Sequence, residues 1–128
     1  FDVGGDDDGD YILGQFNSYF MQENYSMTFV VSTKRPLTKT SDELYDMAQR
    51  IEYASRLKFT GIANNTNLGS LTDSDTLLSD YSEIKKLSEK MSVPICMQCG
   101  TPKALEKLPA ELQKDKFPMK IYIKKPWE

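Results

Sequence analysis

Short runs typical of buried strands alternate with helix-forming segments along this chain, and this alternation restricts the fold more than any other feature. Ser26–Ser32 and Phe59–Ala63 are short and rich in apolar or β-branched residues, the pattern of strands covered on both faces in a parallel sheet. Val93–Met97 predicts a third such strand. Met119–Ile123 alternates less cleanly, as expected for an edge strand protected by lysines and Pro126. Strands spaced in this way predict right-handed βαβ units, and hence an α/β fold with a parallel sheet and flanking helices.

The segments between these runs carry helix signals. Thr40–Glu43 (Thr-Ser-Asp-Glu) forms a capping box at the start of the most clearly amphipathic segment. The apolar stripe of that helix consists of Leu44, Met47, Ala48, Ile51, Ala54 and Leu57. Further helices are predicted from Tyr11 to Phe20, from Thr72 or Asp73 to Met91, and from Thr101 to beyond Pro109, which shortens or kinks the last one.

Composition favours one folded domain over residues 1–128. Apolar residues make up 39% of the chain, enough for a modest core. The formal charge of −3 does not indicate a broad surface for nucleic acid, although acids gather at the start and lysines follow Lys103. No apolar run approaches the roughly 20 residues of a membrane span, so we expect no membrane span. Histidine is absent, which excludes His-based acid–base catalysis and catalytic triads.

Two cysteines, Cys96 and Cys99, stand in a Cys-x-x-Cys arrangement. Two thiols do not define a disulfide scaffold, and we expect a reducing, cytoplasmic setting. A zinc site would need two further ligands from a second chain, and a redox pair would use the helix start at Thr101. We favour a third interpretation, in which Cys96 is a buried structural residue beside a half-exposed Cys99.

The chain opens with an aspartate followed by two glycines, Asp2-Val3-Gly4-Gly5. A carboxylate at the end of a strand, followed by glycines that allow close backbone approach, suits a group that acts on Mg²⁺ or on an attacking water. The phosphate-binding patterns G-x-x-x-x-G-K-[ST] and G-x-G-x-x-G do not occur in the sequence. We therefore expect the chain to carry only part of a nucleotide-binding domain.

These motifs, in this order, resemble the P-loop ATPases of the ParA/MinD/Mrp type, the CobQ/CobB/MinD/ParA nucleotide-binding domains with a deviant Walker motif. The resemblance covers almost the whole chain but only the later half to two-thirds of the family's domain. It implies that Asp2 ends the Walker B strand and polarises water or holds Mg²⁺ through water, and that Gly4 and Gly5 approach the γ-phosphate. It further implies that Asn65 reads the adenine edge, with Asn64 as the alternative. Backbone groups from Cys99 through Gly100, Thr101 and Pro102 would line the base.

The resemblance implies that the groups that bind the phosphates of the nucleotide would precede Phe1. These groups are the P-loop, its lysine and the Mg²⁺-binding Ser/Thr. Without them nothing holds the β- and γ-phosphates, so we expect no ATPase activity from this chain alone and ATP or ADP with Mg²⁺ only in the complete protein. In the family's sheet the P-loop strand lies between the Walker B strand and the strand at Ser26–Ser32. That strand should be left with an open edge, which predicts a homo-oligomer.

Other interpretations stand beside these assignments. In the isolated chain Asp2 and its acidic neighbours favour a solvated terminus. Asn64 and Asn65 equally suit turn formation, and Arg35 is better explained as a rim charge. The leading hypothesis is a fragment of an ATP-binding P-loop ATPase. The alternatives are a non-catalytic interaction module that dimerises through its open sheet edge, and a thiol or metal protein that uses Cys96 and Cys99 across a dimer.

Overall fold

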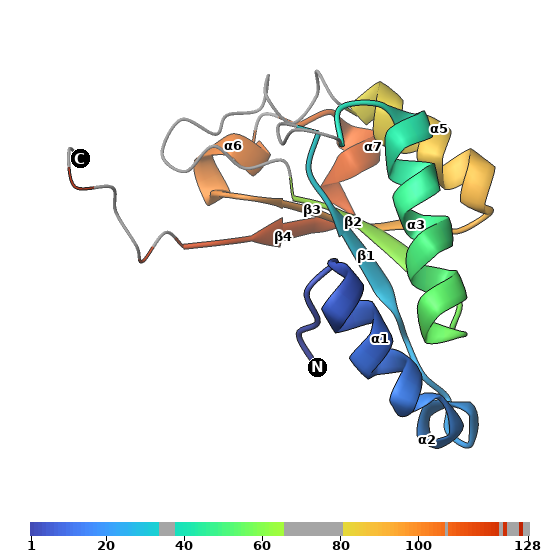
Figure 1. The fold of residues 1–128 in the computed structure, drawn as a ribbon. Helices are drawn as coiled ribbons and strands as arrows, with labels where there is room; N and C mark the ends of the chain where they lie inside the picture. Colours follow the sequence, from blue (N-terminus) through green and yellow to red (C-terminus); the bar gives the residue numbers. More distant parts are fainter. Residues whose placement is uncertain (34–37, 66–80, 107, 121, 123–125, 127–128) are drawn as a thin grey trace.

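The computed structural model describes residues 1–33, 38–65, 81–106, 108–120, 122 and 126. Within them a single sheet is formed by β1 (Thr28–Val31), β2 (Gly61–Asn64), β3 (Ile95–Gly100) and β4 (Lys116–Pro118). The strands lie in the order β1-β2-β3-β4, and each neighbouring pair is parallel. The predicted α/β class with a parallel sheet is therefore confirmed (Figure 1).

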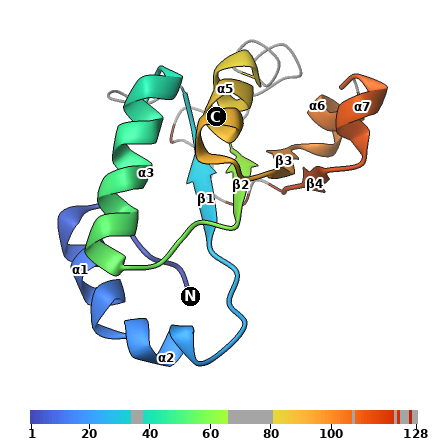
Figure 2. The ribbon, with the colours of Figure 1, turned by 90° about the vertical axis from the view of Figure 1, so that its right-hand side faces the viewer.

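One face of the sheet carries the helices that connect the strands. These are α3 (Ser41–Ser55), α5 (Tyr81–Met91), α6 (Pro102–Glu106) and α7 (Ala110–Gln113). Right-handed crossovers between strands taken in sequential order place all of them on one side, as Figure 2 shows. The main core lies between β1, β2, α3 and α5, and it includes Phe29, Leu44, Ile62, Ile84 and Leu87. A smaller cluster under α6 and α7 contains Ala104, Leu105, Leu108 and Leu112.

The opposite face of β1 is uncovered, so the prediction that this strand is buried on both faces is wrong. Phe29 and Val31 are buried against the helices, whereas Thr28 and Val30 alternate with them and are exposed. Val30 is 60% exposed, which is unusual for a β-branched residue in a parallel sheet. The continuous apolar run could not reveal this, because it is equally apolar on both faces.

The N-terminal helical region begins earlier than its apolar stripe suggests and consists of two helices. Asp6 caps α1 (Asp7–Gln15), since its carboxylate accepts a hydrogen bond from the Gly9 N–H at 2.8 Å. After Phe16 the chain continues as α2 (Asn17–Met21). The single helix predicted from Tyr11 to Phe20 is therefore interrupted.

Helix α1 packs closely on α3 through Gly14. A Cβ atom built on Gly14 would stand 2.5 Å from the Ala54 carbonyl oxygen, which only a glycine permits at this separation. Arg56, at the end of α3 with a positive φ of 57°, donates from Nη2 to the Gly14 carbonyl at 2.7 Å. The side chain of Asn17 donates to the Arg56 carbonyl at 2.8 Å. These contacts fix the end of α1 against the end of α3.

The other helix signals are largely confirmed. Thr40 Oγ1 accepts from the Glu43 N–H at 3.2 Å, so the capping box supplies the start of α3. Pro109 separates α6 from α7, as its position predicted. The predicted helix start at Thr72 or Asp73 lies outside the described residues.

The last strand is displaced from its predicted position. β4 pairs with β3 at Lys116–Pro118, flanked by hydrogen bonds from Gln98 N–H to the Asp115 carbonyl (2.8 Å) and from Met119 N–H to the Gly100 carbonyl (2.7 Å). The prediction of Met119–Ile123 is therefore wrong for Met119, Lys120 and Tyr122, and Ile121 and Ile123 lie outside the described residues. Lysine-bearing β4 and apolar β1 form the two edges of the sheet.

Candidate functional site

Polar side chains gather where β1, β2 and β3 reach their carboxyl ends. Ligands of open α/β sheets bind at this edge, because the loops there leave a crevice. Thr33 follows β1, Asn64 ends β2 and precedes Asn65, and Gln98 lies in the second half of β3. Thr33, Asn64 and Gln98 are all buried.

Asn64 and Gln98 form a buried amide pair. The two residues face each other in the register of β2 and β3, and Asn64 Nδ2 donates to Gln98 Oε1 at 2.9 Å. Their exposed fractions are 0% and 1%. The alternative assignment of adenine recognition to Asn64 therefore loses support, since this amide already binds a neighbouring strand.

Three buried polar atoms in the described part of the chain have no hydrogen-bond partner: Thr33 Oγ1, Asn65 Oδ1 and Gln98 Nε2. Each belongs to a residue at or near the carboxyl end of a different strand of the sheet. A buried polar group without a partner costs about 1–3 kcal/mol, and native proteins hold few of them. Their concentration at the usual ligand edge indicates groups that a bound molecule or water satisfies.

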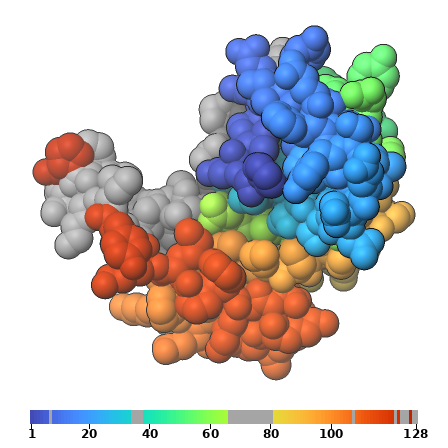
Figure 3. Space-filling view, turned by 90° about the horizontal axis from the view of Figure 1, so that it is seen from below, coloured from blue at the N-terminus to red at the C-terminus, as the bar shows by residue number. Residues whose placement is uncertain are grey.

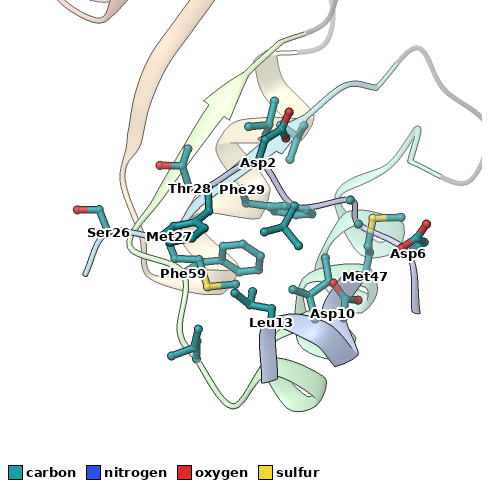
Figure 4. A pocket seen from close by; sticks show the side chains of 18 of the residues that line it. Asp2, Asp6, Asp10, Leu13, Ser26, Met27, Thr28, Phe29, Met47 and Phe59 are labelled. Atoms are coloured by element: carbon teal, nitrogen blue, oxygen red, sulfur yellow. The ribbon is translucent and has the colours of Figure 1, made fainter. Parts of the chain in front are cut away.

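A cavity of about 670 Å³ runs along the outer edge of β1. One wall is the strand with its flanking residues, Ser26–Ser32, and the other is the N-terminal segment, Phe1–Asp6. Figure 4 shows Asp2, Asp6 and Asp10 around it with the apolar side chains of Leu13, Phe29, Met47 and Phe59. The resemblance assigned Asp2, Gly4, Gly5 and Asn65 to one site. All four line this cavity, although α1, α2, β1, α3 and β2 lie between Gly5 and Asn65 in the sequence.

The remaining predicted site residues serve local structure. The Gly100 carbonyl accepts from Met119 N–H at 2.7 Å and so joins β3 to β4. Thr101 Oγ1 accepts from Ala104 N–H at 3.3 Å, and Pro102 is the first residue of α6. None of the three lines the cavity beside β1. Arg35 lies outside the described residues.

The phosphate side of a nucleotide does not fit the described residues. No Lys or Arg is among the described residues that line the cavity, and the carboxylates among them would repel phosphate. Within the described ranges no group of three or more His, Cys, Asp or Glu is placed to hold a metal ion. The base side fits better, since Asn65 offers a buried acceptor without a partner.

The two thiols differ from the predicted arrangement. Cys96 is exposed and its Sγ lies 3.4 Å from the Ile62 carbonyl oxygen, whereas Cys99 is buried. The prediction of a buried Cys96 beside a half-exposed Cys99 is therefore reversed. Burial, with a smaller contribution from Cys96, raises the pKa of Cys99, which opposes the activated thiol of a redox site.

Gln98 and Thr33 were not among the predicted site residues. The available signal was a polar side chain inside or directly after an apolar strand segment, and its meaning depends on the strand register.

None of the helices in the described ranges is long and apolar enough to span a membrane. Comparisons with protein-family models, curated proteins and solved structures find no match for this chain.

Proposed function

We propose that this chain forms the base side of a nucleotide-binding α/β domain of the ParA/MinD/Mrp P-loop ATPase type, with ATP or ADP as ligand and Mg²⁺ required in the complete protein. The observation that carries the proposal is that Asp2, Gly4, Gly5 and Asn65 line one cavity beside β1. The sequence resemblance assigns these residues to one ligand. Their convergence supports a common role.

Asn65 is the residue that would recognise the base. Its backbone N–H donates to the Val31 carbonyl at 2.8 Å, which fixes the residue against β1. Its Oδ1 is buried and has no partner within the described structure. An amide oxygen in this state suits a donor such as the exocyclic amino group of adenine, and guanine presents a carbonyl oxygen at the corresponding position.

The described residues support binding but no turnover. Asp2 could orient water or a hydrated Mg²⁺ ion, yet the described part of the cavity wall contains no Lys or Arg to neutralise phosphate charge. The chain alone should therefore bind the nucleoside part of the ligand with little gain from the phosphates. Activity would need basic and backbone N–H groups from another segment.

Isothermal titration with adenosine, ADP and ATP-Mg²⁺ tests this function. We expect weak binding, with dissociation constants of about 0.1–1 mM, and similar values for adenosine and ATP. Asn65→Ala should weaken adenosine binding about tenfold, whereas Asn24→Ala, an exposed asparagine outside the cavity, should leave it unchanged. Guanosine binding equal to adenosine binding, or no effect of Asn65→Ala, would refute the proposed role.

A second candidate is a non-catalytic module that associates through a sheet edge. The observation that favours it is the outer edge of β1, which pairs with none of the described strands and lies beside the exposed apolar side chain of Val30. Adenosine titration separates the two candidates, because both share the open edge and only the nucleotide domain should bind adenosine through Asn65.

A further inference from the structure

A second pocket, of about 520 Å³, is lined by the N-terminal segment together with α1 and α2. The helices contribute apolar positions with the spacing of one helical face, which continues across the break after α1: Ile12, Leu13, Phe16, Tyr19 and Phe20. Phe1 and Val3 complete the apolar lining. Figure 3 shows the N-terminal segment and the two helices as one continuous blue surface.

Aromatic rings dominate this pocket and stand at steep angles to one another. The ring centroids of Phe1 and Tyr19 each lie 5.6 Å from that of Phe20, at interplanar angles of 83° and 79°. Phe20 also contacts the ring of Tyr25, whose hydroxyl accepts a hydrogen bond from the Lys58 N–H at 3.1 Å. Rings at such angles can surround a small group on more than one side, and the face of an aromatic ring attracts a cation.

The apolar side chains that line the pocket are largely exposed to water. Ile12, Phe16 and Tyr19 are 56%, 56% and 59% exposed, and Phe1 is fully exposed. Single exposed apolar side chains are ordinary on a protein surface, whereas a group of them around one pocket marks a binding surface. We therefore expect this pocket to hold a ligand.

The corner between α1 and α2 is held in place by the protein itself. The side chain of Asn17 donates to the carbonyls of Ser55 and Arg56, at 3.3 Å and 2.8 Å. These bonds join the start of α2 to the end of α3, so the helical wall of the pocket has its shape before a ligand binds.

The charge of this region favours a cation. Residues 1–33 contain six acids and no Lys or Arg. Asp2 is the one charged residue among the described residues that line the pocket. Arg56, which contacts α1 from α3, directs its guanidinium to the Gly14 carbonyl at 2.7 Å and does not line the pocket. A cation in the pocket would gain from the aromatic rings and from the acidic surface around them.

The polar groups of the pocket decide which cation fits. A primary ammonium group has three N–H donors and is strongly hydrated, so it needs several acceptors. Among the described lining residues the polar side chains are Asp2 and the Tyr19 hydroxyl alone. A quaternary ammonium group has no N–H, and its methyl groups suit apolar and aromatic walls. The acidic surface would repel a phosphate on the same molecule, which disfavours phosphocholine and choline lipids.

We infer that the pocket formed by the N-terminal segment, α1 and α2 binds a small quaternary ammonium compound of the choline class, without a phosphate group. The aromatic rings contact the methylated ammonium group, and the acids of this region attract it from a distance. The site is separate in chemistry from the proposed nucleotide site, and the inference holds whether or not the chain binds nucleotide.

Titration with choline, followed by the amide resonances of the chain without nucleotide, tests this inference. We expect shifts at Phe16, Tyr19 and Phe20 and a dissociation constant of about 1–10 mM, as suits an open pocket and a small ligand. The matched probe is the neutral alcohol in which a carbon atom replaces the nitrogen of choline. It has the same shape without the charge and should bind at least about fivefold more weakly.

Two variants identify the groups responsible. The double replacement of Phe16 and Tyr19 with leucine keeps apolar side chains at both positions and removes two rings, so the preference for choline over the neutral alcohol should fall below about twofold. Tyr53→Leu is the control, because Tyr53 on α3 is 88% exposed and does not line the pocket. That variant should bind both probes as the unmodified chain does.

Several outcomes would overturn the inference, and most of them need only the unmodified chain. They are no shift at Phe16, Tyr19 and Phe20 with choline up to about 50 mM, equal binding of choline and the neutral alcohol, and phosphocholine binding as tight as that of choline. A capped trimethyl-lysine that binds at least about tenfold more tightly than choline would assign the pocket to a methylated peptide instead. A loss of choline preference in Tyr53→Leu would place the site elsewhere.

Discussion

The close contact between α1 and α3 predicts that Gly14→Ala destabilises the chain, whereas helix propensity alone predicts that it stabilises it. Replacing a helical glycine with alanine ordinarily stabilises a helix by about 1 kcal/mol. Here the added Cβ would stand 2.5 Å from the Ala54 carbonyl oxygen, so the helices must separate by about 1 Å to restore normal van der Waals contact. The same shift lengthens the 2.7 Å hydrogen bond from Arg56 Nη2 to the Gly14 carbonyl beyond bonding distance.

These contributions can be weighed. Overpacking a close contact costs about 1–3 kcal/mol, and loss of the Arg56 hydrogen bond costs about 1 kcal/mol. After subtraction of the propensity gain, Gly14→Ala should destabilise the chain by about 1–3 kcal/mol. For a domain of this size that lowers Tm by about 4–12 °C.

Urea and thermal unfolding followed by circular dichroism measure this difference, with Gly5→Ala as the matched control. The nearest atom to a Cβ at Gly5 is Ile51 Cδ1 at 3.9 Å, so that variant should stay within about 0.5 kcal/mol of the unmodified chain. If Gly14→Ala were as stable as the unmodified chain or more stable, the close approach of α1 to α3 would be wrong.

Three further predictions concern buried and paired groups. Asn64→Ala leaves the Gln98 amide buried without its partner and should cost about 1–3 kcal/mol in urea unfolding, whereas the double replacement of both residues with leucine should cost less. The Glu83 carboxylate accepts a hydrogen bond from the Ser41 N–H at 2.7 Å, and this bond, together with Lys86, lowers the pKa of Glu83 below the usual 4.5. The stabilising contribution of Glu83 is therefore present above about pH 4.5 and is lost as the pH falls through the lowered pKa. Glu83→Gln should flatten the plot of unfolding free energy against pH in that range. Burial raises the pKa of Cys99, so at pH 8 a thiol reagent should modify one cysteine rapidly and Cys99 at least about tenfold more slowly, and equal rates would contradict its burial.

Local signals predicted the fold where local energetics decide it. Thr40 and Glu43 begin α3 because the side-chain cap needs only four consecutive residues. Pro109 separates α6 from α7 because proline lacks the N–H group that a continuous helix would need there. The break at Phe16 and the exposed face of β1 were missed, because both depend on what packs against them rather than on their own pattern.

The candidate site was predictable only in part. Asp2 and Asn65 line one cavity. Only Asn65 follows a strand there, since Asp2 lies in the irregular segment before α1. The role of Gln98 depends on the register between β2 and β3, which the sequence does not show. Gly100 and Thr101 were assigned to a ligand, yet their polar groups bond to Met119 and Ala104. Loop residues beside a helix start serve capping and ligand binding with the same atoms, so sequence pattern alone does not separate the two.

The pairing of β2 with β3 contains a choice that the amide pair resolves. Ile62 faces Ile95 but Ala63 faces Met97, so Cys96 is an extra residue in β3. Such a bulge leaves two alignments open to the strand, and a slip by one residue exchanges the faces of every side chain that follows. Only one alignment brings Asn64 opposite Gln98, within the sheet and out of reach of water. The amide pair therefore favours the observed register of β2 and β3 over the slipped one. Its loss should raise the population of slipped registers more than the strength of its hydrogen bond alone suggests.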